Sequence, residues 1–398
     1  MEKKTVVVGV TGGIACYKAA ALCSKLTQRG YNVEVVLTKN ATEFIGPHTF
    51  ESLTHNRAMV DTLDRNFQSH VEQVALADKA DLLLVAPATA NIIAKAAHGI
   101  ADDMLSTTVL ACDCPKLMAP AMNTRMYENP VTQDNLSTLR RYGWEVIEPA
   151  TGHLACGATG KGKMPEPEDL LEAVDHAVRY EKDLTGLRIL VTAGPTRERL
   201  DPVRFISNHS TGKMGYAVAR AAAHRGAQVT LISGPVSLKK PAYVETVDVE
   251  SALDMFQAVQ SRVEEQDIII KTAAVADYRP VQVSGEKIKK KEGDLSLPLE
   301  RTDDILGWLG QHRKPGQFLC GFSMETENLV ENSRQKLSRK GIQMICANSL
   351  RQEGAGFGGE TNVLTLITPS GEEALPLMSK EEAAHRVLDA ILRERKPT

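Results

Sequence analysis

Short apolar runs alternate with helix-like stretches along the first half of the chain. Residues 5–10 and 32–37 are rich in valine, and residues 81–86 contain a continuous aliphatic run typical of a strand buried on both faces of its sheet. Shorter runs predict strands at 116–119 and 144–147, and the intervening segments predict helices that end near residues 29, 142 and 180. This alternation predicts a mostly parallel sheet with helices on its faces.

The second half repeats the alternation after a charged segment at residues 179–183. It predicts strands at 188–192, 229–233, 268–271, 318–322 and 344–346, and helices at 216–225, 252–265, 328–339 and 380–393. Residues 281–299 are basic and polar, so we expect them to leave the sheet. The sequence therefore predicts an α/β protein of two Rossmann-like, three-layer domains, residues 1–182 and residues 183–398.

A glycine-dense stretch at residues 151–163 interrupts the pattern near the end of the first predicted domain. It contains glycines at positions 152, 157, 160 and 162. Glycine disfavours both helices and strands because it loses the most conformational freedom on ordering. We therefore expect a mobile loop here.

The composition narrows the classes of protein. The 398 residues are 42% hydrophobic and 24% charged, as in globular proteins, and the net charge of −3 gives no general attraction to nucleic acid or acidic membranes. No apolar run reaches the roughly 18–20 residues of a membrane span, and the N-terminus lacks a secretory pattern. Seven scattered cysteines without a Cys-x-x-Cys pair argue against disulfides and structural zinc. We expect a cytoplasmic protein without nucleic-acid or membrane partners.

Small and polar residues follow two strands of the first half. Gly12 and Gly13 come after the first strand, where backbone amides can approach a phosphate at the start of a helix. Thr38, rather than an acidic residue, follows the second strand, which favours a mononucleotide over a dinucleotide. Ala88 and Thr89 follow the buried strand and could contact a flavin edge. The alternative for Gly12 and Gly13 is a tight turn that binds no ligand, and the alternative for Ala88 and Thr89 is a simple cap of the next helix.

Three further residues of the first half could take part in chemistry. His70 lies in a Ser-x-x-Glu capping-box spacing, so it could be a neutral general base at a helix start or merely part of that start. Asn123 follows a strand and can bind a carboxylate or amide. Cys156 lies in the glycine-dense stretch, where it could be a reactive thiol. The alternative is that it is an incidental small residue. The adjacent Asp102 and Asp103 do not share a helix face, which argues against a metal pair.

The second half offers a phosphate-binding pattern. Small donors surround Asn208 and Lys213 before a predicted helix, although the spacing is not that of a Walker loop. Asp277 follows a strand, where it could hold a metal or a ribose. Lys287 belongs to a run of lysines that could bind a triphosphate or form a solvated loop.

Taken together, these motifs resemble the bacterial bifunctional phosphopantothenoylcysteine decarboxylase / phosphopantothenate–cysteine ligase family, over residues 5–393. In the first half the likeness rests on residues 12–15, 69–71, 86–91, 120–126 and 154–157. In the second half it rests on residues 193–196, 206–215, 273–278 and 287–290. The order of all nine strings makes the likeness specific. It implies a flavodoxin-like flavoprotein domain followed by a ligase domain.

For the first half, the resemblance implies FMN as the cofactor. The residues expected near the flavin are Gly12, Gly13, Thr38, Ala88, Thr89 and Ser106. His70 matches the family's active-site histidine, Asn123 its substrate-binding asparagine and Cys156 its proton donor. A flavin can oxidise the substrate thiol and so create the electron sink that decarboxylation needs. Cys156 would then protonate the enethiolate while the hydride returns.

For the second half, the resemblance implies that a nucleotide activates 4′-phosphopantothenate for attack by cysteine. Asn208 and Lys287 match residues that act on the acyl-nucleotidylate, and Mg²⁺ would help near the phosphates, with Asp277 as the candidate residue beside it. The matches to the nucleotide pocket are Ala273, Asp277, Lys287, Asp304, Ile305, Phe322, Lys336 and Lys340. Asp303 stands where relatives carry proline, in the turn that contacts the base. Bifunctional bacterial members generally use CTP, which is the nucleotide we expect.

The resemblance also implies homo-oligomers, with trimeric contacts in the decarboxylase half and dimeric contacts in the ligase half, which together could give a dodecamer. Two rival functions fit the first half: an oxidative decarboxylase of peptidyl cysteine and a non-catalytic flavin-binding regulator. The presence of Cys156 argues against the first, and His70 with an intact ligase half argues against the second. A pair of nicotinamide-binding domains is disfavoured by the missing acidic strand end.

Overall fold

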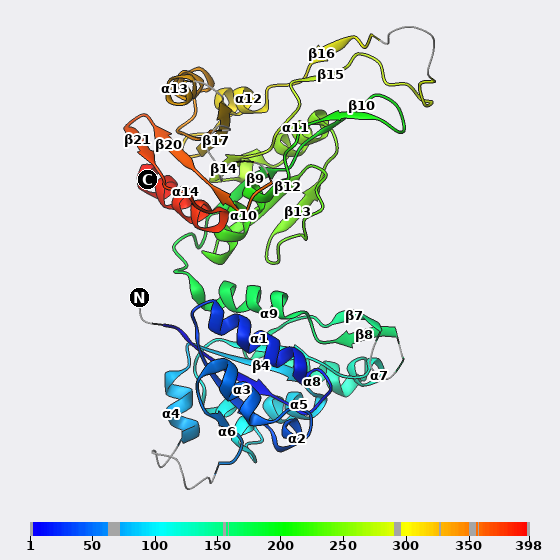
Figure 1. The fold of residues 1–398 in the computed structure, drawn as a ribbon, viewed down its shortest axis with the longest axis vertical. Coiled ribbons are helices and arrows are strands. Elements are labelled where there is room, and N and C mark those ends of the chain that lie inside the picture. Colours follow the sequence, from blue (N-terminus) through cyan, green and yellow to red (C-terminus); the bar gives the residue numbers. More distant parts are fainter. Residues whose placement is uncertain are drawn as a thin grey trace. The chain divides into compact units, whose positions relative to one another are not determined.

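The computed structural model describes residues 3–62, 72–153, 157, 159–289, 296–325, 328–349, 356 and 358–395. The chain divides into two compact units, Met1–Glu181 and Lys182–Thr398 (Figure 1). Each unit is built around its own mostly parallel sheet, so the predicted α/β class is confirmed. Within the described ranges, no helix is long and apolar enough to cross a membrane.

The first unit contains a six-stranded parallel sheet in the order β3-β2-β1-β4-β5-β6. Its strands are β1 (Thr5–Val10), β2 (Asn32–Leu37), β3 (Ala58–Met59), β4 (Leu82–Ala88), β5 (Lys116–Pro120) and β6 (Glu145–Val146). The chain builds outward from β1 to β3 and then returns to place β4 on the other side of β1. This reversal creates a crevice at the carboxyl ends of β1 and β4, where open α/β sheets bind ligands.

Helices cover both faces of this sheet. They are α1 (Cys16–Gln28), α2 (Lys39–Thr42), α3 (Pro47–Thr54), α4 (Glu72–Lys79), α5 (Ala90–His98), α6 (Met104–Ala111), α7 (Thr124–Tyr127), α8 (Pro130–Arg141) and α9 (Pro167–Val174). One buried cluster joins the sheet to α1, α3 and α9, and a second joins its opposite face to α4, α5, α6 and α8. The alternating valines of β1 divide between these clusters, which is why the strand reads as apolar throughout.

The prediction of a mobile loop at 151–163 was wrong for the part that the structure describes. β7 (Ala150–His153) and β8 (Thr159–Lys163) pair as an antiparallel hairpin. Its glycines allow close packing: a Cβ at Gly160 would lie 2.6 Å from Thr124 Oγ1, and one at Gly162 would lie 2.3 Å from Met122 O. The glycines therefore record a close approach of two backbones, which composition alone does not distinguish from flexibility.

The second unit contains an eight-stranded sheet in the order β13-β12-β9-β14-β17-β18-β20-β21. Its strands are β9 (Arg188–Ala193), β12 (Gln228–Ser233), β13 (Glu245–Asp248), β14 (Ile268–Lys271), β17 (Phe318–Glu325), β18 (Met344–Ser349), β20 (Leu364–Thr368) and β21 (Gly371–Ala374). The strands are parallel from β13 to β18, and β20 and β21 add an antiparallel edge. The strand order reverses between β9 and β14, which gives a second crevice.

Two helical layers enclose this second sheet. One face packs against α10 (Lys213–His224) and α14 (Lys380–Glu394), and the other against α11 (Ala252–Gln260), α12 (Ile305–His312) and α13 (Leu329–Lys340). The excursion expected at 281–299 is flanked by a two-stranded ladder of β15 (Tyr278–Pro280) and β16 (Leu299–Arg301). Two further short ladders pair β10 (Arg197–Arg199) with β11 (Phe205–Ser207) and β19 (Thr361–Asn362) with β22 (Met378–Ser379). Figure 1 shows β15 and β16 extending away from the main sheet of their unit.

Two predicted helices are shorter than expected. The helix predicted to end near residue 180 changes at Asp175 to a π-helical turn, Asp175–Arg179. The Asp175 carboxylate accepts hydrogen bonds from Tyr31 Oη at 2.6 Å and Arg29 Nε at 2.9 Å, contacts that no local pattern contains. The helix predicted at 252–265 ends at Gln260, and a 3₁₀ turn, Val263–Glu265, leads the chain into β14.

Candidate functional site

The crevice of the first unit is closed at its base by one buried threonine. Thr11 Oγ1 donates a hydrogen bond to Pro87 O at 2.7 Å and accepts one from Thr89 N at 3.0 Å. Thr11 follows β1, whereas Pro87 and Thr89 belong to the end of β4 and the start of α5. The two segments that the sequence offered as separate flavin contacts are therefore joined through a single side chain.

A cavity of about 520 Å³ opens above this junction. Its lining includes Gly12, Gly13, Thr89 and Asn123 from the predicted site, together with Ile14, Ala15, Ala90, Ala121, Met122, Met126 and Met164. Ligand pockets typically have volumes of about 300–1,000 Å³ and apolar walls with a few polar groups. This cavity therefore suits a flat aromatic ligand that carries a polar tail.

The glycine turn after β1 leaves room for such a tail. A Cβ at Gly12 would lie 2.6 Å from Asn40 Cβ, whereas one at Gly13 would meet no atom within 4 Å. The N-cap residue of helix α1 is Ala15, which supplies no side-chain cap, and the first turn of the helix contains no acidic residue. The positive end of this helix is thus left without a protein anion, an arrangement that favours a phosphate.

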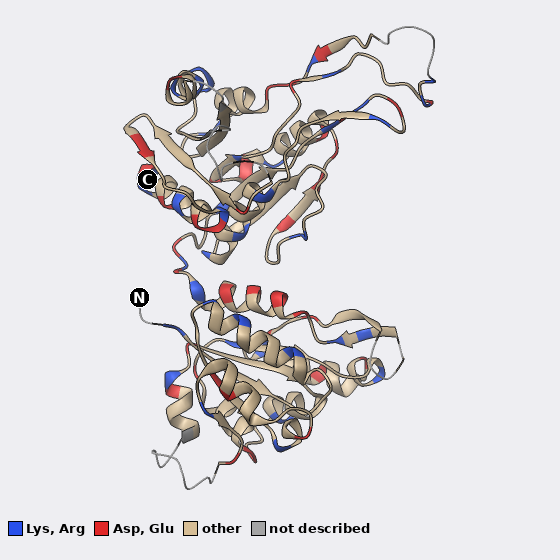
Figure 2. Cartoon of the chain, viewed as in Figure 1, with Lys and Arg blue, Asp and Glu red and all other residues tan. Residues whose placement is uncertain are grey.

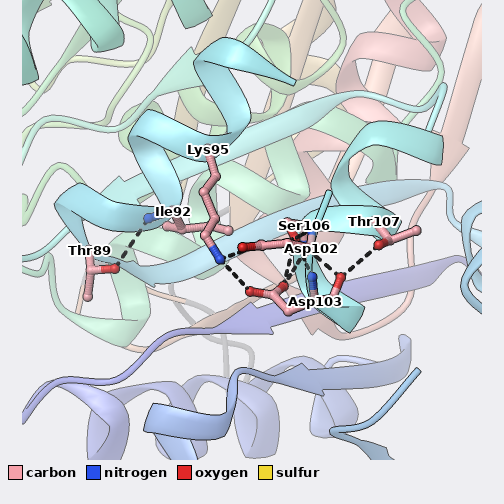
Figure 3. Close-up of polar contacts among 7 residues, drawn as sticks. All are labelled: Thr89, Ile92, Lys95, Asp102, Asp103, Ser106 and Thr107. Carbon is pink, nitrogen blue, oxygen red and sulfur yellow. Dashed lines mark hydrogen bonds and ion pairs between the residues drawn. The ribbon is translucent and has the colours of Figure 1, made fainter. Parts of the chain in front are cut away.

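Not every predicted flavin residue lines this cavity. Thr38 lies half-buried at the end of β2, and Ala88 is buried in β4. Ser106 caps α6: its Oγ accepts hydrogen bonds from Asp102 N at 3.1 Å and Asp103 N at 3.0 Å (Figure 3). It lines a different cavity, of about 530 Å³, between α5, α6 and α8. The structure thus brings Gly12, Gly13, Thr89 and Asn123 together without Thr38, Ala88 or Ser106.

An ion cluster holds Ser106 in place. Lys95 Nζ pairs with Asp103 Oδ2 at 2.9 Å and with Asp102 Oδ1 at 2.5 Å (Figure 3). Burial acts to raise the pKa of Asp103, but the hydrogen bonds from Ser106 and the ammonium of Lys95 outweigh it, so the pKa lies below its usual value. The two aspartates therefore fasten α5 to α6.

Asn123 lies at the start of α7, on the wall of the first cavity. Its Oδ1 accepts a hydrogen bond from Arg125 N at 2.9 Å, and the preceding Met122 N donates to Gly162 O in β8 at 3.0 Å. His70 and Cys156, the predicted base and proton donor, lie outside the described residues. The hairpin that flanks position 156 is nevertheless joined to the turn that carries Asn123.

Two residues of this site were missed by the sequence analysis. His153 lines the cavity from β7, and its Nδ1 lies 3.2 Å from Thr159 Oγ1 across the hairpin. Lys18 is buried in α1, and its Nζ donates to Met164 O at 3.1 Å and to Glu166 Oε1 at 2.8 Å. A lysine among the buried alanines and leucines of α1 was the available signal for Lys18.

The crevice of the second unit contains a smaller cavity of about 250 Å³. Of the predicted residues, Ala273, Asp277, Phe322 and Lys336 line it. Asn208 lies beside it, where its Nδ2 donates a hydrogen bond to Ala274 O at 2.8 Å. Lys340 pairs with the N-cap residue Asp304, and Ile305 is buried in the core below α12. These residues therefore gather around one end of the sheet.

Lys287 is a predicted site residue that does not line this cavity. It is exposed on the excursion between β15 and β16. The neighbouring Ile288 is fastened to the loop after β10, because Asp201 Oδ2 accepts from Ile288 N at 3.1 Å and Arg204 donates to Ile288 O at 2.6 Å. Lys287 would have to approach a ligand from this arm.

Close packing shapes the turn that leads into α10 at the second cavity. A Cβ at Gly215 would lie 2.3 Å from Thr272 Oγ1 and 2.5 Å from Ala193 Cβ. Helix α10 therefore begins directly against the ends of β9 and β14. Gly212, at its N-cap, has a φ of 78° and supplies no side-chain cap. This is the arrangement through which a helix start approaches a phosphate.

The lining of the second cavity is strongly basic. Lys213, Lys271, Lys336 and Lys380 contribute to it, against the single carboxylate of Asp277. Figure 2 shows further basic residues along α13. Asn348 Oδ1 is buried in this lining with no hydrogen-bond partner within the described part of the chain. Buried polar atoms normally have partners, so the excess charge and the free amide oxygen both suit an anionic, hydrogen-bonding ligand.

Lys271, Asn348 and Lys380 were also missed by the sequence analysis. Lys380 donates a hydrogen bond to Gly356 O at 3.0 Å and also bonds Gly359 O, and burial lowers its pKa. Burial lowers the pKa of Lys271 to about 8, with a further contribution from the charge of Lys336. A metal site was not recovered: the described residues contain no cluster of three or more His, Cys, Asp or Glu side chains that could hold an ion.

Comparisons with known proteins agree with the two units. The Flavoprotein family matches residues 1–179, and the DNA/pantothenate metabolism flavoprotein C-terminal domain matches residues 184–394. The chain is 47% identical over 395 residues to the coenzyme A biosynthesis bifunctional protein CoaBC of Bacillus subtilis, covering 98% of this chain and 97% of that protein. It is 44% identical over 395 residues to the protein of the same name from Escherichia coli K12, with the same coverage. A crystal structure of a CoaBC C-terminal domain is 45% identical and covers 52% of this chain and 95% of its own, with a TM-score of 0.45.

Proposed function

The chain belongs to the family of coenzyme A biosynthesis bifunctional proteins, and from this premise we propose a division of labour between its two units. Residues 1–182 form an FMN-dependent phosphopantothenoylcysteine decarboxylase, and residues 183–398 form a CTP-dependent phosphopantothenate–cysteine ligase. The ligase joins 4′-phosphopantothenate to cysteine, and the decarboxylase converts the product to 4′-phosphopantetheine. The observation that carries the assignment is a separate ligand cavity at the strand-order reversal of each unit.

In the first unit, Gly12, Gly13 and Thr89 hold the flavin, whereas Thr38, Ala88 and Ser106 lie outside the lining of this cavity. When bound, FMN supplies the reversible two-electron oxidation of the substrate thiol that makes loss of carbon dioxide possible. The Asn123 amide binds the carboxylate of the substrate, because it lies on the wall of the cavity beside the glycine turn. His70 acts as the general base and Cys156 as the proton donor for the decarboxylated product.

In the second unit, the start of α10 receives the phosphates of CTP. Asn208 and Lys287 stabilise the acyl-nucleotidylate, and a bound Mg²⁺, which Asp277 would help to hold, would supply further positive charge for the phosphates. Ala273, Phe322, Lys336 and Lys340 form the nucleotide pocket with the turn of Asp304 and Ile305. The proposal is supported by the basic lining of the cavity and by the hydrogen bond that holds Asn208 against the loop after β14.

We also propose that the protein is a cytoplasmic homo-oligomer, with trimeric contacts through the first unit and dimeric contacts through the second. The described cysteines are free thiols, in keeping with a reducing compartment. Exposed apolar side chains support contacts between copies: they include Val281, Val283 and Leu299 on the excursion of the second unit and Ile14 and Tyr17 beside the first cavity.

One assay tests both activities. Purified protein is given 4′-phosphopantothenate, cysteine, Mg²⁺ and either CTP or ATP, and pyrophosphate and carbon dioxide are followed together. We expect both products, with CTP preferred. The Cys156→Ser variant should release carbon dioxide but accumulate an oxidised product. A colourless protein that takes up no added flavin would refute the decarboxylase assignment, and a failure to bind any nucleoside triphosphate would refute the ligase assignment.

A further inference from the structure

Lys271 occupies a central position in the sheet of the second unit. It is the last residue of β14 and pairs in register with Thr192 of β9 on one side and Gly321 of β17 on the other. Ile268 and Ile270 face the core below α10 and α14, whereas Ile269 faces the core below α11, α12 and α13. Because side chains alternate along a strand, Lys271 points to the same face as Ile269, beneath α13.

The surroundings of Lys271 are unfavourable for a cation. The charged groups that face it are Lys336 and Lys340 on α13 and Asp277 after β14. Asp277 is exposed, and Lys340 already pairs with Asp304. Among the residues that the structure describes, none forms a hydrogen bond or ion pair with the Lys271 ammonium. Lys271 is half-buried, so its partial loss of contact with water and the nearby charge of Lys336 disfavour the charged form and lower its pKa.

Two other lysines of the same cavity differ in this respect. Lys213 donates to Gly358 O at 2.8 Å and pairs with Glu360, and Lys380 donates to the carbonyls of Gly356 and Gly359. These two ammonium groups have protein partners before any ligand arrives. The group that would compensate Lys271 must therefore come from outside the described chain.

We propose that Lys271 is a ligand-binding residue of this cavity, whose ammonium pairs with an anionic group of a substrate. The anion is a phosphate of the nucleoside triphosphate or the phosphate or carboxylate of the acid that is activated. The inference rests on the proposed ligase function for the identity of these ligands. The proposed site would then contain three groups that contact the anion: the turn at the start of α10, Lys287 on the excursion, and Lys271 on the floor of the cavity.

The test compares Lys271→Met with wild type by calorimetric titration of pyrophosphate, CTP and 4′-phosphopantothenate. Methionine keeps the length and apolar stem of lysine and removes the charge. A hydrogen bond to a charged group contributes enough that its loss should weaken binding about 10- to 100-fold for the ligand that Lys271 contacts. A loss confined to pyrophosphate and CTP assigns the phosphate chain, and a loss confined to 4′-phosphopantothenate assigns the acid.

A stability measurement separates this role from a structural one. Without ligand, Lys271→Met should unfold at a higher temperature than wild type, because it removes a half-buried charge that no described residue pairs. The matched control is Lys314→Met, which removes a surface lysine paired with Glu264 and should change neither binding nor stability appreciably. Decarboxylase activity should be unchanged in both variants.

Unchanged affinity of Lys271→Met for all three ligands would overturn the proposal. If its stability also fell, the role of Lys271 would be structural. Failure of the proposed ligase function is a separate outcome. If the wild-type protein bound pyrophosphate but neither CTP nor 4′-phosphopantothenate, the ligase assignment would fail, whereas the pyrophosphate titration of Lys271→Met would still decide whether Lys271 binds an anion.

Discussion

The two crevices of this protein share a topology and differ in chemistry. In both units the strand order reverses beside the first strand, and a glycine turn leads into a helix without a side-chain cap. The first cavity is larger and is lined mostly by glycine and apolar residues, with Lys18, Lys163 and His153 among its polar groups. The second is smaller and contains four lysines. The reversal thus determines where a ligand binds, and the side chains at the strand ends determine which ligand it is.

The largest expected effect that separates the two cavities comes from a change on the excursion of the second unit. Lys287→Gln should lower the rate of amide formation by about 10²- to 10³-fold, because it removes a charge proposed to stabilise the α-phosphate in the transition state. Pyrophosphate release reports the ligase and carbon dioxide release from preformed phosphopantothenoylcysteine reports the decarboxylase, which should not change.

Lys289→Gln provides the matched control, since Lys289 is exposed on the same segment. An equal fall in amide formation for both variants would show that the net charge of the segment matters rather than a specific contact of Lys287.

The proposed flavin cavity of the first unit is best tested at its glycine turn. Gly12→Ala would place a Cβ 2.6 Å from Asn40 Cβ and 2.8 Å from the backbone of Asn40, so the turn must shift. Overpacking of this kind costs about 1–3 kcal/mol, and we expect the purified variant to lose most of its visible flavin absorbance while keeping ligase activity.

Gly46→Ala serves as its control, because a Cβ at Gly46 would meet no atom within 4 Å. Full flavin content in Gly12→Ala would contradict the placement of the cofactor beside this turn.

A smaller effect is expected from the buried amine of the first unit. Lys18→Met removes the hydrogen bonds to Met164 O and Glu166 that join α1 to the segment after β8. We expect a loss of about 1–3 kcal/mol in the free energy of unfolding of the first unit, measured by denaturant titration.

Lys25 offers a comparison on the same helix, since it pairs with Glu168 in an exposed ion pair. Lys25→Met should change the free energy of unfolding by no more than about 1 kcal/mol. If the two variants changed the free energy of unfolding equally, the buried hydrogen bonds of Lys18 would contribute no more to stability than the exposed ion pair of Lys25.

The smallest effects are expected from removing one helix capping box in each unit. Asp103→Ala removes the cap of α6 and Ser251→Ala removes that of α11, each at a cost of about 1 kcal/mol. Calorimetry should show each variant lowering only the transition of its own unit. A shift of both transitions by either variant would show that the units unfold together.

The Asp103 contribution should also depend on pH. The pKa of Asp103 is lowered in the folded protein, so its stabilisation is complete above the ordinary carboxyl pKa of about 3.9 and is lost as the pH falls through the lowered value. The difference between wild type and Asp103→Ala should therefore be constant near neutral pH and shrink only in strong acid.

The sequence alone predicted the parts of the fold that depend on local pattern. The valine-rich run of β1 and the aliphatic run of β4 identified buried parallel strands, and the glycines after β1 identified the turn at the first cavity. The motif order also identified the family. These features are readable because each depends on residues adjacent in the chain.

Only the tertiary structure decided which distant residues share a site. It showed that Thr11 joins the ends of β1 and β4, that Ser106 serves α6 rather than the first cavity, and that the glycines at 160 and 162 pack a hairpin against α7. It also placed Lys271 beneath α13, where no described residue forms an ion pair with it. A sequence records the identity of a side chain, whereas its burial, its partners and its charge balance arise when strands far apart in the chain become neighbours.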